Sequence, residues 1–269
     1  MTILQFYEGI GLDDGVKRAA LLLEKSFSPE AAAPVFDLLM QPAMREEALA
    51  ALRAAAGEDA DGMTAFVLMA HCAAERTYAA YAARGIPADV FWATMRFLPR
   101  FLLADSRKAG RPVFRWAWWF PRQLALQEFR IGALEYETIE REGAPAVSVH
   151  IPADADFSDE AVGASLCEMR TFFEEFFPAY RDAPVLCESW LLTPVLKELL
   201  PPTSRILAFQ RRFEVLRVDD GSPAALEWIF PDPNVPLEDL PEDTSLRRAV
   251  KRHLLAGGRV GWTLGRLKD

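Results

Sequence analysis

Residues 146–176 read AVSVHIPADADFSDEAVGASLCEMRTFFEEF, and this stretch decides the fold of the second half of the chain. Apolar and polar side chains alternate over residues 146–151, which predicts a strand with Ser148 and His150 on its polar face. Ser158 is expected to cap a helix that runs to residue 176. Apolar residues at helical spacing predict the buried face of this helix: Val162, Leu166, Met169, Phe173 and Phe176. The stretch therefore predicts a strand, a loop and a helix in succession.

Short strands and short helices alternate through the rest of the second half. Strands are predicted at residues 129–139, 185–190, 206–218, 226–230 and 259–264. The turn sequence Asp219-Asp220-Gly221 predicts that 206–218 and 226–230 form a hairpin. Helices are predicted at residues 193–200 and 244–255, the first ending at Pro201-Pro202.

The first 110 residues have the spacing and composition of helices. We predict helices at residues 44–56, 61–84 and 87–106, the last with a kink at Pro99. Residues 108–111 (KAGR) form the expected junction. The chain is therefore expected to fold in the α+β class, with a helical N-terminal domain at residues 1–110 and a mixed-sheet α/β domain at residues 111–269.

Composition and charge exclude several classes of protein. The chain has 269 residues, of which 51% are hydrophobic, so it can bury a large core. Its net charge is −9, which argues against nucleic acid or an anionic membrane as the main partner. No uncharged apolar run is long enough for a membrane span, and the N-terminus lacks the basic residues of a signal peptide. The three cysteines have no CxxC spacing, which is typical of reduced thiols, and we expect a cytoplasmic protein.

Two groups of residues carry a resemblance to a known family. The first group is Arg130, Gly132, Leu134, Tyr136, Glu137 and His150-Ile151-Pro152. The second group is Ser189-Trp190-Leu191-Leu192, Pro194, Leu196, Leu200-Pro201, Ser204, Ile206, Phe209-Gln210 and Arg212-Phe213. With these residues the chain resembles bacterial acyltransferase-domain proteins, which have a helical N-terminal domain and a GNAT-like C-terminal domain. The resemblance covers most of residues 112–230.

The resemblance implies a fold and an activity. The strand at 146–151 should lie parallel to the strand at 185–190 and separate from it to open a cleft. Such a cleft holds acyl-CoA, so the resemblance implies an N-acyltransferase that moves an acyl group from acyl-CoA to an unidentified amine. Residues in the loop and at the start of the following helix are implied to bind the cofactor: Ile151, Pro152, Ala153 and Ser158.

The cofactor loop departs from the family pattern. Residues 152–160 (PADADFSDE) contain no glycine and no basic residue, whereas four of the nine are acidic. Like charges would repel a pyrophosphate there. The alternative is therefore a non-catalytic protein on a degenerate GNAT scaffold, which binds a small ligand or another protein.

Three residues are candidates for catalysis. His150 stands at the end of the cleft strand, where it could take a proton from an attacking amine, or it could be a structural histidine. Glu137 could act as a carboxylate base or form an ordinary salt bridge. Ser189 could face the cleft or cap the next helix.

Four further residues are candidates for binding substrate: Arg130, Trp190, Gln210 and Arg212. Cross-strand charge pairing would explain Arg130, Gln210 and Arg212 equally well, and Trp190 is most simply a core residue. No cluster of metal ligands is expected, because His71 and Cys72 diverge on one helix and His253 is far along the chain. The expected partner is a small-molecule amine, and a homodimer is left open.

Overall fold

The computed structural model describes residues 1–26, 28–222, 224–230 and 232–268. The chain divides into two compact units, Met1–Ile131 and Gly132–Asp269. The junction expected at residues 108–111 spans the end of the helix Phe97–Ala109, within the first unit. Among the residues that the structure describes, none of the helices has the length and hydrophobicity needed to cross a bilayer.

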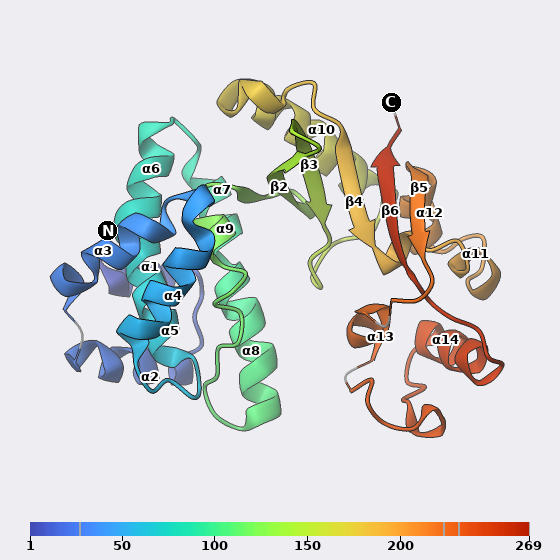
Figure 1. Ribbon diagram of the computed structural model, residues 1–269, viewed down its shortest axis with the longest axis horizontal. Coiled ribbons are helices and arrows are strands. Elements are labelled where there is room, and N and C mark those ends of the chain that lie inside the picture. The colour runs from blue at the N-terminus through green and yellow to red at the C-terminus, as the bar shows by residue number, and fades with distance from the viewer. Residues whose placement is uncertain (27, 223, 231, 269) are drawn as a thin grey trace. The chain divides into compact units, whose positions relative to one another are not determined.

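The first unit is helical, as the sequence predicts (Figure 1). Its helices are α1 (Ile3–Gly9), α2 (Asp14–Leu23), α3 (Pro29–Leu39), α4 (Arg45–Ala56), α5 (Met63–Cys72), α6 (Tyr78–Ala83), α7 (Ala88–Met95), α8 (Phe97–Ala109) and α9 (Pro121–Leu124). A π-helical turn at Ala73–Thr77 joins α5 to α6, so the helix predicted at 61–84 is continuous. Buried aromatic rings form its core, with Phe91 in edge contact with Tyr81 at 5.3 Å and tilted against Phe6 at 6.2 Å.

The kink expected at Pro99 lies elsewhere. The helical path breaks at Arg96, between α7 and α8, and Pro99 falls in the first turn of α8. A proline is tolerated there because the first N–H groups of a helix have no intrahelical acceptor.

A six-stranded mixed sheet defines the rest of the fold, in the order β1-β2-β3-β4-β6-β5. The strands are β1 (Glu128–Ile131), β2 (Leu134–Arg141), β3 (Ala144–His150), β4 (Val185–Ser189), β5 (Phe213–Asp219) and β6 (Trp262–Leu267). The strand pair β3–β4 is parallel, whereas β2–β3, β4–β6 and β5–β6 are antiparallel.

The helices of the second unit include α10 (Asp159–Phe176), α11 (Leu196–Leu199), α12 (Arg205–Arg211), α13 (Ala224–Ile229) and α14 (Ser245–Leu255). Helix α10 confirms the prediction for 158–176, and Figure 1 shows it behind the strands of the sheet. It packs on the face that carries Tyr136, whose hydroxyl lies 2.8 Å from Ser165 Oγ in α10. His150 and Glu137 lie on the opposite face, because side chains alternate along each strand.

Three strand predictions were wrong. The segment 129–139 is two strands, because Gly132 adopts φ +59° in a turn, and a Cβ there would lie 3.0 Å from the Cβ of Ser165. The segment 206–218 is helix α12 followed by strand β5.

The segment 226–230 lies mostly in helix α13 rather than in a hairpin strand, and β5 pairs instead with β6. Ala225 and Ile229 are buried four residues apart, which is the spacing of one helix face. They join a core cluster that also contains Phe230, Leu240, Val250 and Val260.

Candidate active site

Strands β3 and β4 meet only over part of their length. Their parallel ladder pairs Val147 with Val185, Ser148 with Leu186 and Val149 with Cys187. Strand β3 continues to His150 and β4 to Ser189, beyond the last pair. The prediction of adjacent parallel strands is confirmed. The two strands stop pairing before their C-terminal residues, His150 and Ser189.

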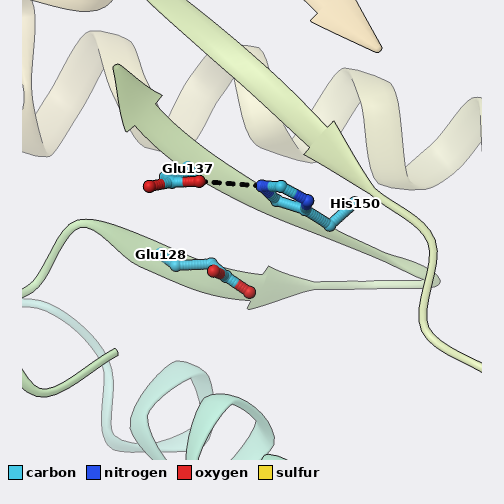
Figure 2. A group of neighbouring side chains, drawn as sticks. All are labelled: Glu128, Glu137 and His150. Carbon is cyan, nitrogen blue, oxygen red and sulfur yellow. Dashed lines mark hydrogen bonds and ion pairs between the residues drawn. The ribbon is translucent and has the colours of Figure 1, made fainter. Parts of the chain in front are cut away.

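His150 and Glu137 form a hydrogen-bonded pair on this part of the sheet. The imidazole Nε2 lies 2.9 Å from Glu137 Oε2, and Figure 2 marks this contact with a dashed line. His150 lies directly opposite Glu135 in the β2–β3 register, so the pair with Glu137 is a diagonal one on the same face. The Glu137 side chain is 9% exposed and the His150 side chain 25% exposed.

This arrangement orients the imidazole. A buried carboxylate that accepts the proton of Nε2 favours the tautomer in which Nδ1 carries a lone pair. The histidine side chain remains partly open to solvent, so a bound molecule can reach the imidazole. The geometry therefore suits a general base that is held in place by a carboxylate.

Ser189 lies on the other face of the sheet. The β3–β4 register aligns Ser148 with Leu186, so Leu186 and Glu188 share the face of His150, whereas Cys187 and Ser189 do not. The Ser189 hydroxyl accepts a hydrogen bond from the backbone N–H of Leu191 at 3.2 Å. It caps the short 3₁₀ helix Trp190–Leu192, which confirms the capping alternative.

The loop predicted to bind the cofactor is a sequence of tight turns. The N–H of Ala155 donates to Pro152 O at 2.9 Å, and Ser158 Oγ accepts from the N–H of Ala161 at 3.2 Å. Ile151 is half-buried, Pro152 is buried and Ala153 is exposed. The N–H groups of the first turn of α10 point out of the helix, as at any helix start.

Two arginines from a distant segment lie beside the acidic loop. Arg212, the C-cap residue of α12, donates to the Asp159 carboxylate at 2.7 Å and to its carbonyl oxygen at 3.0 Å. Arg205 lies 3.9 Å from Asp156. Hydrogen bonds from Ser158, with a smaller contribution from Arg205, hold the pKa of Asp156 below its usual value. The loop sequence lacks basic residues, but the fold supplies them from more than 40 positions away.

The other predicted substrate-binding residues have structural contacts. Gln210 is buried, and its amide nitrogen donates to Thr193 O at 2.8 Å. Trp190 packs against the core cluster around Val250. Arg130 lies on β1 in the first unit, where its backbone N–H donates to Thr94 Oγ1 at 2.9 Å. None of these contacts identifies a substrate.

The expectation that no group of metal-ligating residues forms was wrong. One ligand atom from each of Glu128, Glu137 and His150 lies within 4.8 Å of the other two. Figure 2 labels all three residues. Local sequence spacing could not predict this group, because its members come from three strands.

Two family models match the sequence of the chain. Residues 1–126 match the N-acyltransferase N-terminal domain, and residues 128–267 match the GNAT-like C-terminal domain. The chain belongs to this acyltransferase family. The resemblance drawn from residues 130–213 is thereby confirmed. Among curated proteins, none matches the chain.

Solved acyltransferase structures share the fold along the whole chain. A complex with decanoyl-CoA is 25% identical, with a TM-score of 0.71 over 99% of this chain and 99% of that chain. A complex with decanoyl-CoA and teicoplanin is 24% identical, with a TM-score of 0.71 over 100% of this chain and 99% of that one. A mutant in complex with octanoyl-CoA is 23% identical, with a TM-score of 0.72 and the same coverage.

Proposed function

We propose that this acyltransferase moves an acyl group from acyl-CoA to an amine, with His150 as the general base and Glu137 as the residue that positions it. The observation that carries the proposal is the 2.9 Å bond between His150 Nε2 and the buried Glu137 carboxylate at the open end of β3. The family supports the reaction class, and His150 supplies the proton acceptor that the reaction requires.

The proposed reaction begins with a neutral amine beside the thioester carbonyl. The amine nitrogen forms a bond to the carbonyl carbon, and its proton passes to the His150 imidazole. The carbon–sulfur bond then breaks, and the leaving coenzyme A thiolate takes that proton from the His150 imidazolium, which regenerates the neutral base. Glu137 stabilises the transient imidazolium through Nε2–H, which keeps the ring oriented throughout the transfer.

Arg212 is the proposed contact for the cofactor phosphates. Its guanidinium lies at the N-terminus of α10, where helix N–H groups favour an anion. Asp159 holds that guanidinium in the free protein, so a pyrophosphate would compete with Asp159 for it. A cation already in place thus offsets the repulsion expected from the acidic loop.

The complexes of related acyltransferases guide the choice of substrates. Those proteins were captured with octanoyl-CoA, decanoyl-CoA and, in one case, teicoplanin. We therefore propose a medium-chain acyl donor and an amine on a glycopeptide-like acceptor.

The test is a turnover assay on the full chain with acetyl-, octanoyl- and decanoyl-CoA against a panel of amines that includes teicoplanin. Release of free coenzyme A thiol should depend on the amine, and mass spectrometry should show one acyl group on the product. A stoichiometric complex with acyl-CoA or amine, without transfer, would instead identify a binding protein. Absence of both binding and transfer would contradict the proposed function.

A further inference from the structure

A cavity in the first unit lies outside the catalytic machinery. It has a volume of about 410 Å³, which is within the range of small-molecule sites. The end of α4, the loop that follows it, the start of α5 and residues 115–118 surround it. All of these segments belong to the unit Met1–Ile131.

The wall of the cavity is apolar and includes an exposed tryptophan. Leu49, Leu52, Ala65 and Ala117 line it together with Trp118, which is 51% exposed. The Trp118 ring stacks on Trp116 at 5.7 Å and meets Trp119 edge-on at 5.3 Å. Neighbouring rings therefore support Trp118 in a position that leaves half of its surface in water, where an apolar ligand could cover it.

The cavity is lined by two arginines and one carboxylate, and the carboxylate has hydrogen-bond partners of its own. Arg53 and Arg115 line it, and neither guanidinium makes an ion pair or hydrogen bond to the described residues. The acidic residue in the lining, Asp59, accepts hydrogen bonds from the N–H groups of Thr64 at 3.1 Å and Ala65 at 2.8 Å. Among the described residues its carboxylate accepts these bonds at the start of α5 and forms no ion pair with either arginine.

Arg115 has one further electrostatic neighbour. The pKa of Asp105 is raised by burial, and a hydrogen bond from the Arg115 backbone N–H, together with the Arg115 charge, lowers it in part. Even so, Arg53 remains without an acidic partner among the described residues, and the lining holds two arginines beside one carboxylate.

We propose that this cavity binds a monocarboxylate with an apolar body. The carboxylate would bind Arg53 and Arg115, whose planar guanidinium groups match its two oxygens. The apolar body would cover Leu52 and Trp118. An aliphatic acid and an aromatic acid share this chemistry, and a flat ring would favour stacking on Trp118.

The test is calorimetric titration of the full chain with octanoate and with 2-naphthoate, beside 1-octanol and octylamine as uncharged and cationic controls. Each carboxylate should bind with a dissociation constant below about 1 mM, and at least about 10-fold more tightly than the two controls. If octanol or octylamine binds as tightly as octanoate, or if no carboxylate binds at about 10 mM, the proposal is wrong. A preference for naphthoate would identify an aromatic ligand.

Variants locate the site. Arg53→Gln and Arg115→Gln should each weaken carboxylate binding by about 5- to 10-fold, and Trp118→Ala by about 10-fold or more. Arg107→Gln, on α8, is the matched control and should bind as the wild type does. Arg212→Gln separates this cavity from the catalytic unit, because it should leave carboxylate binding unchanged. Loss of binding in Arg212→Gln, with none in Arg53→Gln or Arg115→Gln, would overturn the proposal without affecting the proposed acyl transfer.

Discussion

Two hydrogen-bonded pairs lie on the same face of the sheet, and they differ in burial far more than in distance. His150 and Glu137 are 2.9 Å apart, and Glu188 and Arg217 are 3.1 Å apart. The second pair spans β6, because Glu188 and Arg217 both lie opposite the buried Leu264. Its side chains are 42% and 64% exposed, whereas Glu137 is only 9% exposed.

The difference shows why short distances alone do not identify a site. Water and salt screen the Glu188–Arg217 pair, so it contributes little to stability and does not fix the orientation of either side chain. Glu137 is shielded from water, so its bond to His150 fixes the imidazole ring and its tautomer. Burial at the open end of β3 is what makes the first pair a candidate for catalysis.

Replacing His150 by alanine should have the largest effect on activity. Loss of a general base lowers kcat by about 100- to 10,000-fold. The melting temperature should change little, because the side chain is partly exposed. The measurement is steady-state kinetics beside thermal unfolding, with His253→Gln on α14 as the control. If His150→Ala keeps full turnover in a folded protein, His150 is not the base.

Glu137→Gln should lower kcat by about 10- to 100-fold, since the amide keeps the shape of the carboxylate but loses its charge. KM for either substrate should stay near the wild-type value, and the pH profile of kcat should shift. Glu140→Gln, an exposed residue of the same strand, is the control and should leave both unchanged. A rise in KM with an unaltered pH profile would argue against a positioning role.

Arg212→Gln tests a third pair, which is intermediate in burial. The Arg212 side chain is 28% exposed, beside the exposed Asp159. We expect KM for acyl-CoA to rise about 10-fold with little change in kcat, because a charge-assisted phosphate contact is lost. Arg211→Gln, the adjacent and exposed arginine of α12, should behave as the wild type. Equal effects of the two variants would exclude a specific phosphate contact.

Glu188→Gln should have a small effect. The exposed pair with Arg217 contributes less than about 1 kcal/mol to the free energy of unfolding. Urea unfolding at low and high salt would measure the change, and kcat should stay at the wild-type level. A large loss of activity would show that this pair, and not burial alone, supports the site.

The smallest expected effect concerns Asp156 and depends on pH. Its pKa is lowered from the usual 3.8 in the folded protein, so its contribution to stability is present above the unfolded pKa and disappears as pH falls through the folded pKa. Thermal melts of the wild type and Asp156→Asn should therefore differ near neutral pH and converge in acid. A difference that persists in strong acid would mean that Asp156 acts through something other than its charge.

The sequence predicted α10 and β3 well because each has an unambiguous period. Ser158 begins the helix as its N-cap, and the buried positions of α10 follow the helical stripe. The prediction of a single strand at 206–218 was wrong, because Phe209 and Phe213 lie four residues apart, a spacing that fits both a strand face and a helix face. The structure ends the helix at Arg211 and starts β5 at Phe213.

The strands of the candidate site could be predicted from the sequence, but the contacts between its side chains could not. His150, Glu137 and Arg212 were all singled out by the sequence or by the family resemblance. The bond of His150 to Glu137 depends on the β2–β3 register, and the pairing of Arg212 with Asp159 joins residues 53 positions apart. Neither follows from local spacing, because register and long-range packing are set by the whole sheet.

The sequence by itself determined the helical first half, the strand–loop–helix at residues 146–176 and the family, since these depend on local periodicity and on residues at fixed offsets. The tertiary structure alone decided which faces of the strands meet. It placed Ser189 on the face of the sheet away from His150 and buried Glu137 beside the imidazole. It also brought arginines to an acidic loop. The physical reason is that burial and the distance between charges, which govern proton transfer and anion binding, belong to the packed chain and not to any segment of it.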